Sequence, residues 1–161
     1  MKKQILSCVL LLLVAAAVRA QSIPFWKLEQ LKAAIANVKK PTIFNFWATF
    51  CQPCVQEIPY FQRTVRSYDS AGVQLVLVSL DLPETYPQKI MAFARKHGFT
   101  APIRYLDETN ADLFCPAVDT SWSGAIPASL FINPKNGYRK FYEARLEPAQ
   151  LNQAIRDMLT Y

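Results

Sequence analysis

Two cysteines separated by two residues, Cys51 and Cys54, carry the clearest chemical signal in the sequence. They follow an apolar run over 42–47 that predicts a buried strand, and the residues after them predict a helix. A cysteine at the start of a helix faces unpaired backbone N–H groups and the positive end of the helix dipole, which favour the thiolate over the thiol. Because the thiolate is the form that attacks a disulfide, this motif in this context points to thiol–disulfide exchange.

The two cysteines differ in position, which predicts different roles. Cys51 lies nearest the helix start and should be the more exposed, so we expect it to attack the disulfide of a partner. Cys54 lies one turn further into the helix and should resolve the mixed disulfide. A purely structural disulfide is the alternative, but so short a loop restricts the unfolded chain little and makes a weak staple.

A zinc site is a second alternative for the same cysteines. Cys51, Cys54, Cys115 and His97 could in principle supply the three-cysteine, one-histidine set that zinc accepts. The chain lacks a second close pair of ligands, and thiols of exported proteins are often oxidised. We therefore expect no metal and no cofactor here.

Glu57 is the first acidic residue after the cysteines. It follows Cys54 by three residues, which places both side chains on one face of the predicted helix. A carboxyl group turned inward there would be desolvated, its pKa would rise, and it could exchange a proton with Cys54. The spacing alone fits a solvated surface glutamate equally well.

Three other residues are weaker candidates for chemistry. Pro127 follows Ile126 at the start of a predicted strand, and the residues alone favour an ordinary trans bond. His97 precedes a glycine at a predicted helix end, which is typical of a surface histidine that compensates the helix dipole. Cys115 lies in an apolar patch, which predicts a buried, inert thiol.

The first twenty residues predict a secretory signal peptide. Lys2 and Lys3 precede an apolar stretch, and the segment 18–20 offers small residues at positions −3 and −1 of a cleavage site. The apolar core over 5–18, 14 residues long, is short for a membrane span, so an uncleaved anchor is less favoured. We expect cleavage near Ala20, export to the periplasm or another outside compartment, and one domain over 21–161.

Composition excludes some partners. The 161-residue chain carries a net charge of +6, and loss of the signal peptide would leave 15 basic against 12 acidic residues, a net charge of +3. So small a charge does not indicate nucleic acid or an anionic membrane. Three cysteines would remain, so one thiol is left over from any single disulfide.

Helical and strand patterns alternate along the chain. Strands are expected over 42–47, 73–80, 101–106, 128–132 and 138–143, and helices over 28–38, 53–68, 87–96, 110–118 and from 148 onward. This alternation, closed by a hairpin and a helix, predicts an α/β fold with a sheet of mixed strand direction.

Two segments carry a resemblance to a known family. Asn45-Phe-Trp-Ala-Thr-Phe-Cys-Gln-Pro-Cys54, with Glu57 and Pro59 after it, resembles the active-site segment of the thioredoxin-like superfamily. The TlpA/ResA-like exported thiol–disulfide oxidoreductases are the most similar branch. Ser123-Gly-Ala-Ile-Pro-Ala-Ser-Leu-Phe-Ile132 is similar to the segment with the family's cis-proline. The resemblance covers 25–161 and implies a thioredoxin-like fold, a central mixed sheet flanked by helices, with an inserted strand and helix within 82–124, before the cis-proline.

The resemblance also implies roles for individual residues. Cys51 and Cys54 would form the redox disulfide, Glu57 would be buried beside it, and the bond before Pro127 would be cis. The partner-binding surface would consist of Trp47, Phe50, Ile126 and Pro127.

The chain departs from the family pattern at two positions. Asn45 stands where thioredoxins proper have a buried aspartate, so Glu57 would have to relay the proton. Phe50 replaces the usual tryptophan before the first cysteine, a conservative exchange.

An enzyme that reduces disulfides of exported proteins is the activity that the resemblance implies. Apocytochrome c, in cytochrome c maturation, is a candidate partner, and a membrane electron donor would be needed. The uncharged Gln52-Pro53 dipeptide favours a reductase, because a histidine or lysine there would stabilise the thiolate. We expect a monomer and no nucleic-acid partner.

Three alternative functions stay open from the sequence. The chain could be a dithiol oxidase, a peroxiredoxin-like peroxidase, or a non-catalytic binding module with the same fold. A peroxiredoxin needs a threonine three residues before its reactive cysteine, where this chain has Ala48. The intact set of Cys51, Cys54, Glu57 and Pro127 argues against a binding module.

Overall fold

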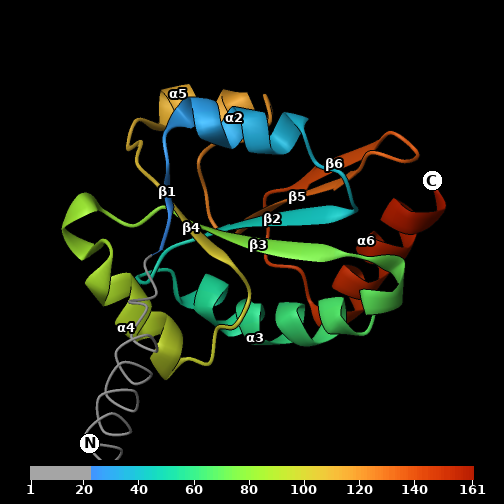
Figure 1. Cartoon of the computed structure of the whole chain (residues 1–161), viewed down its shortest axis with the longest axis horizontal. Helices are drawn as coiled ribbons and strands as arrows, with labels where there is room; N and C mark the ends of the chain where they lie inside the picture. The colour runs from blue at the N-terminus through green and yellow to red at the C-terminus, as the bar shows by residue number, and fades with distance from the viewer. Residues whose placement is uncertain (1–22) are drawn as a thin grey trace, which may run out of the picture.

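A six-stranded mixed sheet between two layers of helices forms the centre of the computed structural model, which describes residues 23–161 (Figure 1). The strand order is β1-β4-β3-β2-β5-β6. The first four strands in this order are parallel, β5 is antiparallel to β2, and β6 is antiparallel to β5. The strands are β1 (Phe25–Trp26), β2 (Thr42–Trp47), β3 (Gln74–Ser79), β4 (Ile103–Leu106), β5 (Ala128–Asn133) and β6 (Tyr138–Tyr142). The predicted signal peptide lies outside the described residues.

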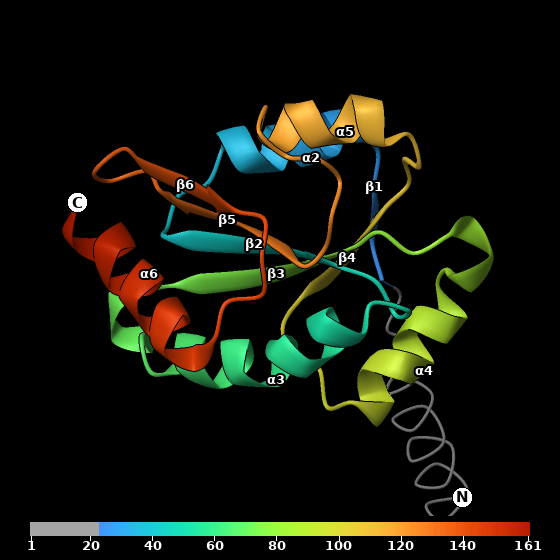
Figure 2. The ribbon, with the colours of Figure 1, turned by 180° about the vertical axis from the view of Figure 1, so that it is seen from behind.

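Helices cover both faces of this sheet. One face carries α2 (Leu28–Ala36) and α5 (Ala111–Val118), and the other carries α3 (Gln52–Arg66), α4 (Gln88–Lys96) and α6 (Pro148–Thr160), as the two opposite views show (Figures 1 and 2). Short 3₁₀ turns, η1 (Asp69–Ala71) and η2 (Pro83–Thr85), follow α3 and β3. None of the helices within 23–161 has the length and apolar character needed to cross a lipid bilayer.

The central strand β2 is buried at every position because helices cover both of its faces. Alternate side chains point to opposite faces, so Ile43 and Trp47 pack in the core under α3 and α6, whereas Phe44 and Phe46 pack under α2 and α5. Asn45 lies between Ile43 and Trp47 in this alternation. Its amide therefore points toward α3.

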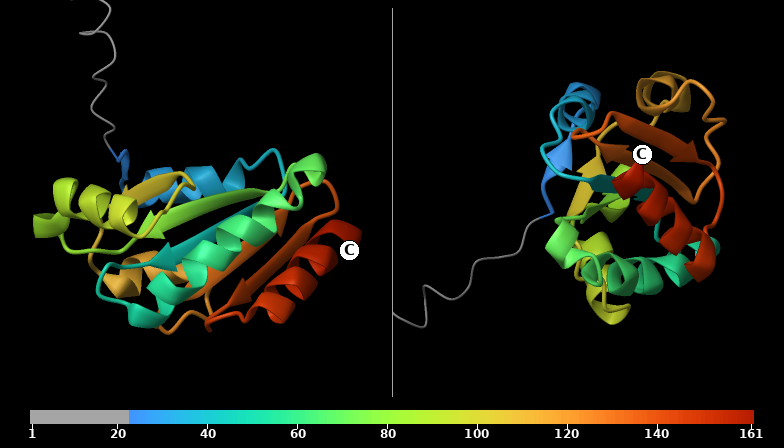
Figure 3. Two further views of the ribbon diagram at one scale, coloured as in Figure 1. Left: turned by 90° about the horizontal axis from the view of Figure 1, so that it is seen from below. Right: turned by 90° about the vertical axis from the view of Figure 1, so that its right-hand side faces the viewer.

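Helix α3 begins directly after the first cysteine. Cys51 is its N-cap, and Pro53 lies in the first turn, where a missing N–H costs no helical hydrogen bond. The helix runs along the sheet beside α6 (Figure 3). Its buried face includes Cys54, Glu57, Ile58 and Phe61, which recur at helical spacing.

The predicted fold class is confirmed, and so is each strand and helix expected from the pattern, with shifts of a few residues at the ends. The segment 82–124 contains η2, α4, β4 and α5 before the cis-proline. Strand β1 was not expected: its two residues pair with Tyr105 and Leu106, and the pairing partner rather than a local pattern defines it.

Candidate functional site

Cys51 and Cys54 form a disulfide at the junction of β2 and α3. The Cys51 sulfur accepts the backbone N–H of Cys54 at 3.3 Å, which places it at the N-terminal end of the helix. Cys51 is 7% exposed and Cys54 is fully buried. A thiolate formed at Cys51 would therefore meet a backbone donor and the positive end of the helix dipole, and Cys51 is the more accessible sulfur.

Glu57 is buried one turn after Cys54, at 1% exposure. One carboxylate oxygen accepts the Asn45 amide at 2.8 Å, and the other accepts the Leu146 N–H at 3.3 Å. Burial raises the pKa of Glu57 to about 7, although these hydrogen bonds and the nearby Arg145 charge act in the opposite direction. The carboxyl group can thus gain or lose a proton near neutral pH.

Asn45 links Glu57 to the neighbouring strand. Its amide nitrogen also donates to the Ser129 hydroxyl at 3.0 Å, and the two residues are directly paired between β2 and β5. The Asn45 carbonyl oxygen is buried without a hydrogen-bond partner among the described residues. No local pattern in the sequence marks Ser129 as a site residue, because its contact with Asn45 depends on the alignment of two strands across 84 residues.

The loop before β5 contains Ile126 and Pro127. The Ile126–Pro127 peptide bond is cis, and Ile126 packs against the same core that contains Cys51 and Cys54. The Glu143 carboxylate fixes this loop by accepting the N–H groups of Ser123 and Ala125 at 3.0–3.1 Å, and also the Ser123 hydroxyl. These bonds, the Ser123 hydroxyl first, lower the pKa of Glu143.

Only part of the predicted partner-binding set lies at the surface. Phe50, directly before Cys51, is 70% exposed, and Ile126 is partly exposed. The assignment of Trp47 to this surface is wrong, because Trp47 is fully buried against Phe93 and Phe99. Pro127 is buried and follows the partly exposed Ile126 in the chain.

The four candidate zinc ligands do not converge. Cys51 and Cys54 are joined to each other in the core under α3, whereas Cys115 lies in the core under α2 and α5, across the sheet. His97 is exposed at the end of α4, stacked on Phe93.

Differential alkylation is expected to separate Cys115 from the other two thiols. Cys115 is 4% exposed, and burial raises the pKa of its thiol, so little thiolate is accessible. In the reduced, folded protein, iodoacetamide should label Cys51 first and Cys115 only after denaturation, as peptide mass spectrometry would show. Fast labelling of Cys115 in the folded protein, or its recovery in the main disulfide, would contradict this assignment.

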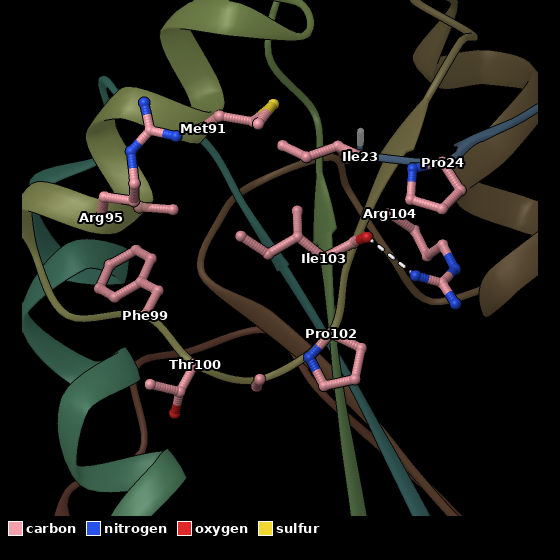
Figure 4. Close-up of a pocket in the computed structure, with 11 residues that line it drawn as sticks. Ile23, Pro24, Met91, Arg95, Phe99, Thr100, Pro102, Ile103 and Arg104 are labelled. Atoms are coloured by element: carbon pink, nitrogen blue, oxygen red, sulfur yellow. Dashed lines mark hydrogen bonds between the residues drawn. The ribbon is translucent and has the colours of Figure 1, made fainter. Parts of the chain in front are cut away.

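A groove of about 520 Å³ lies elsewhere, between α4 and β4. Figure 4 shows that Arg95 and Arg104 on its walls point away from each other, and Arg104 donates to the carbonyl of Ile103 at 3.0 Å. No residue of the disulfide site lines this groove.

Comparison with known proteins gives consistent results. The model of the AhpC/TSA family matches residues 20–139. The thiol-disulfide oxidoreductase ResA of Oceanobacillus iheyensis is 29% identical over 119 residues, which cover 74% of this chain. The chain spans 57% of the length of that protein.

Solved structures show the same fold. StoA from Bacillus subtilis is 29% identical with a TM-score of 0.56, and the match covers 75% of this chain and 86% of that one. A thiol:disulfide interchange protein of the thioredoxin family from Chlorobium tepidum matches with a TM-score of 0.61, covering 78% of this chain and 84% of that one. At 20% identity, the second match supports the fold alone.

Proposed function

This chain belongs to the AhpC/TSA family, and on that basis we propose that it is a thiol–disulfide oxidoreductase that works through a Cys51–Cys54 dithiol/disulfide cycle. The observation that carries the proposal is the disulfide at the start of α3, with the Cys51 sulfur on the N–H of Cys54. The similarity to ResA and StoA supports it.

The first step uses Cys51. Its thiolate attacks one sulfur of the partner's disulfide, that S–S bond breaks, and one partner sulfur leaves as a thiolate while a mixed disulfide forms. The helix N-terminus stabilises the attacking thiolate, and Cys51 is the more exposed of the two cysteines.

The second step uses Cys54 and Glu57. The Glu57 carboxylate takes the proton of the Cys54 thiol, and the Cys54 sulfur then attacks Cys51. The second partner sulfur leaves and is protonated, so two electrons have passed to the partner and the Cys51–Cys54 disulfide is restored. A pKa of about 7 suits Glu57 to this transfer near neutral pH.

The partner would dock on the surface formed by Phe50 and Ile126, next to Pro127. Phe50 offers a large exposed apolar side chain and directly precedes Cys51 in the chain. The Glu143 contacts hold the loop before β5 in place. Exported proteins with disulfides, with apocytochrome c as one candidate, are the proposed partners.

The protein would be exported and would pass electrons to its partners. Residues 1–20 would direct export and be cleaved near Ala20, leaving the thioredoxin-like domain over 21–161. A reductase in an oxidising compartment needs a membrane electron donor, because its disulfide must be reduced after each cycle.

The reduction potential is expected to lie below about −220 mV, in the range of reductases. The reason is that Gln52 and Pro53, between the cysteines, add no positive charge that would stabilise the Cys51 thiolate. Equilibration of the purified protein with defined ratios of reduced and oxidised glutathione would measure it. A potential near about −120 mV would instead assign the protein as a dithiol oxidase.

An insulin-reduction assay with dithiothreitol distinguishes the enzyme from a binding module, which would not accelerate precipitation. A peroxidase is disfavoured because the position three residues before Cys51 is Ala48, a buried residue without a hydroxyl. Peroxide consumption at the rate of insulin reduction would reverse that preference.

A further inference from the structure

Asp81 is a buried carboxylate, 1% exposed, two residues after the end of β3. Its Oδ1 accepts the Thr49 backbone N–H at 3.0 Å and the Thr49 hydroxyl at 2.5 Å. Its Oδ2 accepts the Ser79 hydroxyl at 2.8 Å and also lies 3.2 Å from the Thr49 nitrogen. Both oxygens are therefore satisfied by two residues, one of them on the loop that leads to the disulfide.

These contacts begin where the backbone ladder ends. The Leu80 N–H donates to the Trp47 carbonyl at 2.8 Å at the carboxyl ends of β3 and β2. Thr49 and Asp81 lie just beyond this bond, so the Asp81 side chain joins the two segments after the strands have stopped pairing. The next bond along the chain, from the Cys51 N–H to the Ala48 carbonyl at 3.0 Å, closes the turn that delivers Cys51 to the helix.

Burying a carboxylate costs free energy because the charge is removed from water, whereas burying an apolar side chain at the same place would not carry this cost. The presence of Asp81 therefore calls for a compensating role. The exchange steps proposed above do not use Asp81. Its charge also reaches the core: burial raises the pKa of Tyr105, and the negative charges of Asp107 and Asp81 raise it further. What the carboxylate gains is three donors, and two of them, the N–H and the hydroxyl of Thr49, fix the position of that residue, two residues before the reactive sulfur.

We propose that Asp81 is a positioning residue for Cys51, acting through Thr49 to hold the turn over 48–50 so that the Cys51 sulfur stays at the N-terminus of α3. The consequence for catalysis rests on the proposed function, but the effect on the Cys51 thiol does not. Asp81 touches no reacting atom in this scheme.

The test compares Asp81→Asn with Asp81→Ala in the reduced protein. Both variants lose the charge, and every other ionisable group, including Cys54, Glu57 and Tyr105, is kept, so electrostatic effects of residue 81 cancel between them. An asparagine oxygen can still accept from Thr49 while its amide donates to Ser79, whereas alanine leaves Thr49 unheld.

The readout is the pH dependence of Cys51 alkylation by iodoacetamide. If the turn loosens, the Cys51 sulfur spends less time at the helix N-terminus. The pKa of the Cys51 thiol should therefore be about half a unit higher in Asp81→Ala than in Asp81→Asn. At pH 7 this corresponds to about threefold slower alkylation. Equal pKa values in the two variants would overturn the proposal.

A control variant and a second pair of variants complete the test. Glu108→Ala removes a carboxylate that accepts a backbone N–H, that of Asn110, in another loop, and should leave Cys51 alkylation unchanged. If Asp81→Ala does not fold, Thr49→Val against Thr49→Ser decides: only valine loses the hydroxyl bond, so its Cys51 pKa should be the higher, and equal values would refute the role of Asp81.

The measurement needs no partner protein, so it separates this inference from the proposed function. Different Cys51 pKa values in the Asp81 variants, with no insulin reduction by the wild type, would support the positioning role and reject the activity. Equal values with normal insulin reduction would do the reverse.

Discussion

Cys51→Ser is expected to abolish disulfide exchange completely. A serine hydroxyl at this position is not ionised at neutral pH and cannot form a mixed disulfide, so no first step exists. Cys54 cannot replace it, because Cys54 is fully buried and lies past the helix start. Insulin reduction by the variant should fall to the rate of dithiothreitol alone.

Cys54→Ser should have a different effect. Its Cys51 can still attack, but nothing resolves the product, so mixed disulfides with partner proteins should accumulate. Non-reducing gels and mass spectrometry of the trapped complexes would detect them and identify the partners. Cys115→Ser is the control and should behave as wild type, because Cys115 lies across the sheet. Trapping by Cys51→Ser instead would reverse the two roles.

Glu57→Gln is expected to remove a large pH dependence of stability from the oxidised protein. The pKa of Glu57 rises from its ordinary 4.5 to about 7 on folding, so between these values the folded form binds more protons than the unfolded chain. The contribution of Glu57 to the stability of the wild type is therefore greatest below pH 4.5 and is lost as the pH rises through 7, a loss of about 3 kcal/mol. The glutamine variant cannot ionise and should lack this loss.

Urea unfolding of the oxidised proteins at several pH values from about 5 to 8 would measure the effect, free of thiol titration because both active-site cysteines are bonded. Glu29→Gln is the control, because Glu29 is an exposed residue on α2 paired only with Lys32. If the free energy of unfolding changed with pH equally in wild type and Glu57→Gln, Glu57 would not be the buried group whose pKa rises on folding.

Exchange kinetics provide an independent test of Glu57. Without a group that takes the Cys54 proton, the rate of the resolving step near pH 7 should fall at least about tenfold. This factor is smaller than the range typical of general acid–base catalysis. Glu57→Gln should also keep a native circular dichroism spectrum. Unchanged rates from about pH 6 to 9, the range around a free thiol pKa, would mean that Glu57 takes no part in exchange.

The sequence predicted those parts of the fold that depend on local pattern. The apolar run of β2 and the cysteine at the start of α3 gave the strand, the helix and their junction correctly. Strand β1 was missed because two residues carry no periodicity and only their pairing with β4 defines them. The surface assignment of Trp47 came from the resemblance and is wrong because Trp47 ends β2, a strand that is buried on both faces.

The candidate site divides in the same way. Cys51, Cys54 and Glu57 follow one another along a helix, so their spacing indicated their common placement. Asn45 with Ser129, and Thr49 with Asp81, are hydrogen-bonded across 84 and 32 residues. Such partners are set by strand order and register, which no local pattern specifies.

The two edges of the sheet bear on whether partner proteins would aggregate with this protein. One edge strand, β1, has two residues, and the other, β6, exposes Arg139 and Lys140. Short or charged edge strands resist addition of a further strand from another chain. If the partners are incompletely folded proteins whose extended segments lie against the disulfide, these edges would let the protein bind them without strand addition that leads to aggregation.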